Sequence, residues 1–324
     1  MKRVDRILLW ADSEVPDAVS LERAVSRARI WNAELHIVDV VSRGWFESRL
    51  AKRAVSFQQI ESAQVEDRQM VLDETVAKVA SPDVQITSAV LVGNPVPTIV
   101  REVVDGSHDI LFKGPAPKAE SRRTPLGTSD MRLVRACPCP VAILRAEQSQ
   151  GLIVAAVDVT STADSSLNRA IMDWALQGFF EFHPKLHVLH AWDLYGESIL
   201  ASPRMKLDSG QLAELREDER SSREAKLNDL IDGYCGTLDQ KTAEGFSPAP
   251  LLVKGDPRTS IPAKIEQVEA DMLILGSAAS EGPDRLLIGN TAEALLGSVR
   301  CSVLVVRPNG PETPVSSVRD RSPE

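Results

Sequence analysis

The 324-residue chain lacks the features that mark membrane, secreted and nucleic-acid-binding proteins. No apolar run approaches the roughly 20 residues needed to span a bilayer. The apolar run that begins at Ile7 stops at Asp12, which is too short for a secretory signal. Four cysteines form neither a disulfide framework nor a zinc pattern. A net charge of −9 gives no electrostatic reason to bind nucleic acid. We therefore expect a cytoplasmic protein without a membrane span or nucleic-acid partner.

Motifs for catalysis are also missing. The chain has no GxxxxGK[ST] phosphate loop, no nucleophile elbow and no paired carboxylates at a recognisable spacing. His187 and His190 lie three residues apart on an expected strand, so they point to opposite faces and do not share a metal ion. The sequence predicts no catalytic residue and no metal site, and the protein is not expected to be an enzyme.

What the sequence does contain is an internal duplication. Residues 109–145 and 271–307 each read as a buried strand, a glycine-bearing loop, a helix and a final apolar strand. Several residues of the first copy reappear 162 positions later, at the boundaries of these elements and inside them. The corresponding pairs include Asp109 and Asp271, Leu111 and Leu273, Gly114 and Gly276, Gly127 and Gly289, Leu133 and Leu295, Cys139 and Cys301, Val141 and Val303, and Arg145 and Arg307.

The rest of each half repeats as well. Strand and helix patterns alternate as β-α-β-α-β-α-β-α-β, an order that implies an α/β fold with a parallel sheet and right-handed crossovers. A chain of this length is sufficient for two domains, each with a core of its own. We expect domains at residues 1–147 and 151–308. A polar, proline-rich tail at 309–324 is expected to be disordered.

Four features of both halves resemble the universal stress protein family, and most of all its tandem members of the E type. They are an acid that ends the first strand (Asp12 and Asp158), a Gly-x-Pro element after the third strand, an aspartate before the fourth strand, and the glycine loop. The resemblance extends from about residue 3 to residue 307. It implies two tandem, Rossmann-like, five-stranded parallel sheets of strand order 3-2-1-4-5. That order places a ligand crevice between strands one and four.

In nucleotide-binding members of this family the loop reads G-x2-G-x9-G-[S/T]. The second half has an alanine at the second glycine position and an asparagine at the hydroxyl position. If the alanine position requires positive φ, its Cβ costs on the order of 1 kcal/mol. The resemblance implies ATP or another nucleotide-type ligand, with adenosine near the strand-one acid and phosphate near the loop. The implied ligand-binding residues are Ala156, Asp158, Ala191, Leu275, Gly276, Ala279, Gly289, Asn290 and Thr291.

The loop of the first half is less suited to phosphate. Pro117 occupies the second glycine position, and Pro115 and Pro125 lie in the same loop. Each proline removes an N–H donor, and a cradle made of backbone amides cannot spare three of them. We therefore expect the first half to be structural and any ligand to bind in the second half.

These features favour a non-enzymatic stress-response protein that binds a small ligand and acts through conformation or protein partners. Three alternatives remain open: a ligand-free interaction scaffold, a binder of a larger nucleotide-linked or partly apolar ligand, and a slow ATPase. The apolar segment 193–206 would suit the second of these as a lid, although a flap packed on its own domain is the simpler expectation.

The final strands, at 141–144 and 303–306, are apolar edge strands. An exposed apolar edge invites pairing with another strand, so something must cover it. We expect the two halves to pair through these strands as an intramolecular pseudo-dimer. Association into a homodimer stays open.

Overall fold

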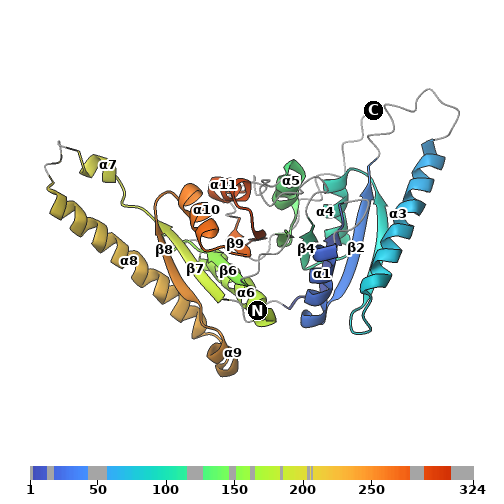
Figure 1. Ribbon diagram of the computed structural model, residues 1–324, viewed down its shortest axis with the longest axis horizontal. Helices are drawn as coiled ribbons and strands as arrows, with labels where there is room; N and C mark the ends of the chain where they lie inside the picture. Colours follow the sequence, from blue (N-terminus) through green and yellow to red (C-terminus); the bar gives the residue numbers. More distant parts are fainter. Residues whose placement is uncertain are drawn as a thin grey trace.

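The computed structural model describes residues 3–12, 18–42, 57–114, 127–145, 151–160, 165–182, 185–202, 205, 207–277 and 288–307. Their strands form one ten-stranded sheet of order β3-β2-β1-β4-β5-β10-β9-β6-β7-β8 (Figure 1). The strands are β1 (Arg6–Trp10), β2 (Glu34–Val41), β3 (Ile86–Val92), β4 (Ile110–Lys113), β5 (Val141–Ile143), β6 (Leu152–Ala156), β7 (Lys185–Trp192), β8 (Ala249–Lys254), β9 (Met272–Gly276) and β10 (Ser302–Val306).

Within each half all strand pairings are parallel, and the order is 3-2-1-4-5. The predicted fold class is therefore confirmed. Helices connect the parallel strands and cover both faces of the sheet, which explains the short, continuous apolar runs in the strands. The helices are α1 (Ala18–Trp31), α3 (Phe57–Val79), α4 (Pro95–Asp105), α5 (Thr128–Ala136), α6 (Ser165–Phe182), α7 (Glu197–Leu200), α8 (Ser209–Cys235), α9 (Gln240–Gly245), α10 (Pro257–Gln267) and α11 (Asn290–Ser298).

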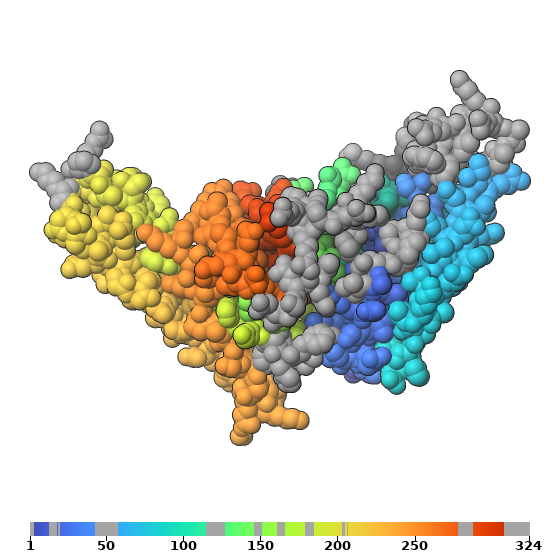
Figure 2. Space-filling view, in the orientation of Figure 1, coloured from blue at the N-terminus to red at the C-terminus, as the bar shows by residue number. Residues whose placement is uncertain are grey.

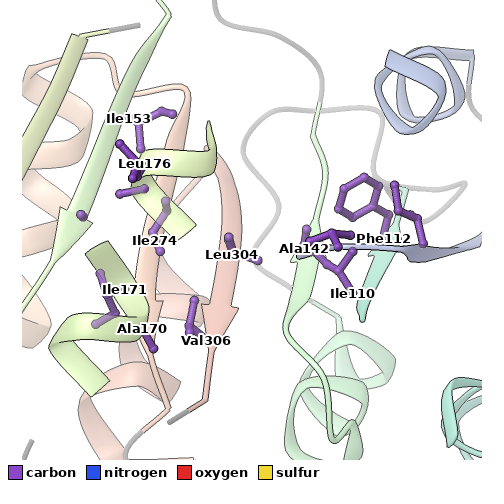
Figure 3. Packing of buried hydrophobic residues seen from close by; sticks show 14 of the residues in the cluster. Ile110, Phe112, Ala142, Ile153, Ala170, Ile171, Leu176, Ile274, Leu304 and Val306 are labelled. Atoms are coloured by element: carbon purple, nitrogen blue, oxygen red, sulfur yellow. The ribbon is translucent and has the colours of Figure 1, made fainter. Parts of the chain in front are cut away.

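The two halves join edge to edge through β5 and β10. These strands are antiparallel, with Val303 opposite Ile143 and Val305 opposite Val141. Every residue of both strands is buried. Leu304 and Ala142 meet across this junction on neighbouring strands (Figure 3). The predicted pairing of the two edge strands is confirmed, and it removes the apolar edge that each half would otherwise expose.

Two apolar layers continue across the junction. One contains α1, α3, α6 and α8, and the other contains α4, α5, α10 and α11, which appear in a row in Figure 1. In the first layer Trp31 of α1 meets Trp174 of α6 edge to face, with ring centroids 6.0 Å apart. Figure 2 shows the first half (blue to cyan) and the second half (yellow to red) at opposite ends of the molecule. The halves thus share both cores in addition to one sheet.

The duplicated aspartates, Asp109 and Asp271, accept hydrogen bonds from the backbone at the start of strand one in each half. Asp109 Oδ2 accepts hydrogen bonds from the backbone N–H groups of Asp5 (2.9 Å) and Arg6 (3.1 Å). Asp271 Oδ2 accepts one from the N–H of Leu152 (2.9 Å). Each aspartate therefore ties the start of strand four to the start of strand one. This tie fixes the register of the two strands between which the crevice is expected.

The second crossover of the second half contains α7, α8 and α9. Glu197 of α7 forms ion pairs with Arg216 and Lys254, at N–O distances of 2.5 and 2.7 Å. Tyr195 is 98% exposed and Ile199 is 64% exposed. Ion pairs attach this segment to its own domain, and Leu194 and Leu200 are half-buried there. The expectation of a flap packed on its own domain therefore holds for only part of the segment, because Tyr195 and Ile199 do not pack on it. The predicted tail at 309–324 lies outside the described residues. No helix among the described residues is long and apolar enough to cross a membrane.

Candidate functional site

The carboxyl ends of β6 and β9 lie side by side in the second half. Ala156 of β6 is in register with Leu275 of β9 on one side and with Leu189 of β7 on the other. Ala191 lies two residues beyond Leu189, so it is level with Asp158, which follows β6. The structure therefore gathers one part of the predicted site at a single edge of the sheet: Ala156, Asp158, Ala191, Leu275 and Gly276.

The start of α11 supplies the other part of the predicted site. α11 leads from β9 back to the start of β10, so its amino end lies near the carboxyl end of β9. Gly289 is the N-cap residue and provides no side chain to cap the helix, while Asn290 and Thr291 are exposed in its first turn. Amide groups and the helix dipole at such an end favour an anion. Ala279 lies outside the described residues.

Asp158 is held in place from two directions. Its Oδ1 accepts hydrogen bonds from the backbone N–H (2.8 Å) and the hydroxyl (2.5 Å) of Thr160. The buried amide side chain of Asn168, in α6, donates to the backbone carbonyl of Asp158 (2.6 Å) and accepts from its N–H (3.1 Å). The carboxylate is exposed. Asn168 was missed by sequence reasoning, because one polar residue on an amphipathic helix has no distinguishing pattern.

Gly276 has a packing reason to be glycine. A Cβ at this position would lie 2.6 Å from the side chain of Leu167, near the start of α6. No carbon atom fits at that distance, so a larger residue would push α6 away from β9. The neighbouring residue of α6 is Asn168, which positions Asp158. Gly276 thus keeps the helix that orients the acid close to the sheet.

The same edge of the first half is occupied by the chain itself. Lys113, the last residue of β4, is 1% exposed. Its Nζ lies 2.7 Å from Asp12 Oδ2 and 2.6 Å from Asp130 Oδ1. The sequence did not predict a role for Lys113 or Asp130. Aligning the two copies position by position would have found them, because Leu275 and Ala292 stand at the equivalent places.

The histidines of β7 point to opposite faces, as predicted. His190 is buried, with Nδ1 3.1 Å from the carbonyl oxygen of Val157, and its charged surroundings include Arg223 of α8. His187 faces Lys264 of α10. Burial lowers the pKa of both imidazoles. Within the described ranges, no three His, Cys, Asp or Glu side chains are placed to hold a metal ion.

A cavity of about 250 Å³ lies at the opposite, amino edge of the first half. Two histidine rings on its wall, His36 and His108, are almost parallel, with centroids 5.9 Å apart. Sequence reasoning did not predict it, because its walls come from segments far apart in the chain. The lining residues are Arg6, Glu34, His36, Gln85, Thr87, Glu102, Gly106 and His108.

Comparison with known proteins places this architecture in one family. The universal stress protein family matches the chain twice, at residues 3–145 and 152–307. Universal stress protein E of Salmonella typhi is 27% identical over 229 residues, which cover 68% of each chain. The protein of the same name from Photorhabdus laumondii is 24% identical over 232 residues, 70% of each chain.

Two solved structures have the same fold along nearly the whole chain. A protein of unknown function, PA1789 from Pseudomonas aeruginosa PAO1, superposes with a TM-score of 0.61 at 21% identity, covering 94% of this chain and 93% of that one. A universal stress protein from Archaeoglobus fulgidus gives a TM-score of 0.60 at 18% identity and covers 95% of this chain and 98% of that one. With a family match in each half and relatives named universal stress protein E over about 70% of its length, the chain belongs to the universal stress protein family, as a tandem member of the E type.

Proposed function

We propose that this stress-response protein binds an adenine-nucleotide-type ligand in the second half, at the carboxyl ends of β6 and β9. It would act in the cytoplasm through a change of conformation or through protein partners, without catalysis. The observation that carries the proposal is the contrast between the two halves. The second half has an exposed Asp158, a small side chain at Ala156 and an alanine, Ala292, where the first half has the capping Asp130. The first half fills the corresponding space with charged side chains.

Each group would have a distinct part in binding. Asp158 and the backbone at Ala191 would face the adenosine, where a carboxylate and a carbonyl accept hydrogen bonds from hydroxyl and amine groups. Leu275 and Ala156 would form the apolar floor. The N–H groups at the start of α11, with Asn290 and Thr291, would surround phosphate. Orientation of the acid by Asn168 supports this arrangement, because a preformed site loses less entropy on binding.

Titration calorimetry with ATP tests the proposal directly. Binding should weaken in Asp158→Ala, which removes the acid, and in Gly289→Val, which places a branched side chain at the phosphate position. Asp12→Ala is the matched control, because Lys113 already engages that carboxylate. Ala279→Gly should tighten binding if backbone strain in the loop limits affinity. The proposal is contradicted if the wild-type protein shows no binding, or if Asp12→Ala and Asp158→Ala lose affinity equally.

A partly apolar, nucleotide-linked ligand is the second candidate. Tyr195, Ile199 and Met205 follow the carboxyl end of β7 and are 98%, 64% and 47% exposed. Exposed apolar side chains on one segment are typical of contact with an apolar surface. Mass spectrometry of gently purified protein separates the candidates. Co-purified nucleotide alone supports the first, and a nucleotide-linked lipid supports the second. An empty protein with tight protein partners would support an interaction scaffold instead.

A further inference from the structure

The carboxyl ends of β1 and β4 in the first half carry large, buried side chains that interact with one another. Trp10 and Lys113 end β1 and β4 and are in register with each other. Lys113 Nζ lies 5.0 Å from the centre of the Trp10 ring, within the range of a cation–π contact. Trp10 is 1% exposed. The ammonium is thus enclosed by an indole and by the carboxylates of Asp12 and Asp130.

The second half has small or apolar side chains at the matching positions. Ala156 and Leu275 are in register on β6 and β9, as Trp10 and Lys113 are on β1 and β4. The third position is N3, the third residue of the helix after the glycine loop: Asp130 in α5 and Ala292 in α11. The first half therefore holds an indole, an ammonium and a carboxylate where the second half holds two methyl groups and one isobutyl group.

Asp130 also occupies the place where a phosphate would bind. Its Oδ2 accepts a hydrogen bond from the N–H of Gly127 (2.9 Å), at the start of α5. At the start of α11 the equivalent N3 residue is Ala292, whose methyl group cannot accept a hydrogen bond from Gly289. A carboxylate at a helix start satisfies the same N–H groups and the same dipole that attract a phosphate. An incoming phosphate would have to displace Asp130.

Displacement would be costly on electrostatic grounds. Removing Asp130 from Lys113 would leave a buried ammonium with one fewer counter-charge, and separating a buried ion pair is strongly unfavourable. Another acid, Asp39 on β2, is 5% exposed and paired with Arg68 at 2.6 Å. Burial and the nearby Asp12 raise the pKa of Asp39. A polyanionic ligand would therefore approach three carboxylates whose compensating cations are already engaged.

We propose that Lys113 and Asp130 are specificity-determining residues: together they replace the ligand in the first half and restrict a nucleotide-type ligand to the second half. This inference rests on the proposed function. Lys113 contacts the strand-one acid, Asp12, as the ligand would. Asp130 binds at the start of α5, as the phosphate of the ligand would. Ion pairing and a helix cap thereby turn one copy of a duplicated binding domain into a structural partner for the other.

Moving the pair into the second half tests the inference. The double variant Leu275→Lys/Ala292→Asp introduces the same cation and anion beside Asp158, and the matched control Leu275→Met/Ala292→Ser changes the same positions without charge. Titration calorimetry with ATP should give one site per chain in the wild type, and the uncharged variant measures what the change of side-chain shape alone costs. The charged double variant should bind at least about tenfold more weakly than the uncharged one. If it does not fold, Leu275→Lys alone, with Asp158 as its partner, is measured with the same expectation.

The outcomes separate the inference from the proposed function. Two ATP molecules per wild-type chain, or wild-type affinity in the charged variant, would overturn the inference and leave the proposed function standing. A wild-type protein that binds no ATP contradicts the proposed function. In that case the reverse variant Lys113→Leu/Asp130→Ala tests the inference. The inference is supported if this variant binds ATP and loses that binding when Asp12→Ala is added. It is overturned if the variant does not bind ATP.

Discussion

The burial of Lys113 and the pKa of His108 both depart from what is usual for their residue types, because of the groups that surround them. Lysine is ordinarily a surface residue, yet Lys113 is among the largest fully buried side chains, because two carboxylates and an indole enclose it. Histidine ordinarily titrates near neutrality, yet His108 does not. Burial, His36 and Arg6 lower the pKa of His108 to about 4, and Asp109 opposes them. The wall of the amino-edge cavity therefore carries an uncharged imidazole at neutral pH.

A pH-dependent stability follows from His108. The folded-state pKa lies below the ordinary value of 6.5, so between pH 6.5 and 4 the unfolded chain binds a proton that the folded chain does not. The free energy of unfolding should therefore fall as the pH drops through this window. In His108→Gln the fall between pH 7 and pH 5 should be smaller than in the wild type, as measured by urea unfolding. The two proteins should respond alike between pH 7 and pH 8. An unchanged slope in the variant would contradict this assignment.

The equivalent helices α5 and α11 differ in the side chains that bind their ends. α5 and α11 occupy equivalent places, but α5 is capped at its start by Asp130, whereas α11 has Ala292 at that position. The carboxyl end of α5 is bound by the other half. Arg307, just after β10, donates from Nη2 to the carbonyl oxygens of Val134 (2.8 Å) and Arg135 (2.5 Å). Both ends of α5 are thus satisfied by side chains.

Removing Arg307 should weaken the junction between the halves. Arg307→Ala leaves two carbonyl groups of α5 without a donor and takes a cation away from the negative end of the helix dipole. The expected loss is about 1–2 kcal/mol of unfolding free energy, measured by urea denaturation. Arg300→Ala is the control, because Arg300 pairs with Glu266 on the surface, where both side chains are about half exposed or more. Surface ion pairs of this kind contribute little. Equal losses in the two variants would refute a special role for Arg307.

The molecule as a whole is one sheet with two continuous apolar layers. β5 and β10 join the halves, and residues of both halves contribute to each layer. A covalent connection is therefore not what holds the halves together after folding. Burial of both edge strands and the contact between Trp31 and Trp174 provide the attraction.

A cleavable linker tests this directly. We expect that a protease site inserted at residues 148–151 can be cut without separating the halves, because the paired strands and shared cores remain in contact. After cleavage, size-exclusion chromatography should show a single species at the mass of the whole chain. The same sample in denaturing urea should give two. Separation in native buffer would show that the junction depends on the linker.

Much of the fold was predictable because it depends on patterns along the chain. Short apolar runs, turn residues and a duplicated spacing predicted two α/β halves with parallel sheets, and the family resemblance implied the strand order in each half. Two apolar edge strands led to the prediction that they pair. The acid at the end of strand one and the glycine loop indicated which edge of the sheet to examine. These inferences need only the identity of residues and their order, since parallel strands with helical crossovers leave few topologies open.

Only the tertiary structure decided what fills each crevice. Asp12, Lys113 and Asp130 are distant in the sequence, and no spacing indicates that one ammonium meets both carboxylates. The hydrogen bond from Asn168 to the backbone of Asp158 likewise depends on how closely α6 packs on the sheet at Gly276. The sequence alone determined that this protein is a duplicated α/β chain, and the prolines in the first glycine loop already indicated that the halves differ. Only tertiary contacts showed which side chains fill the first half, because an ion pair, a cap and a close packing contact each require atoms to meet within a few ångströms.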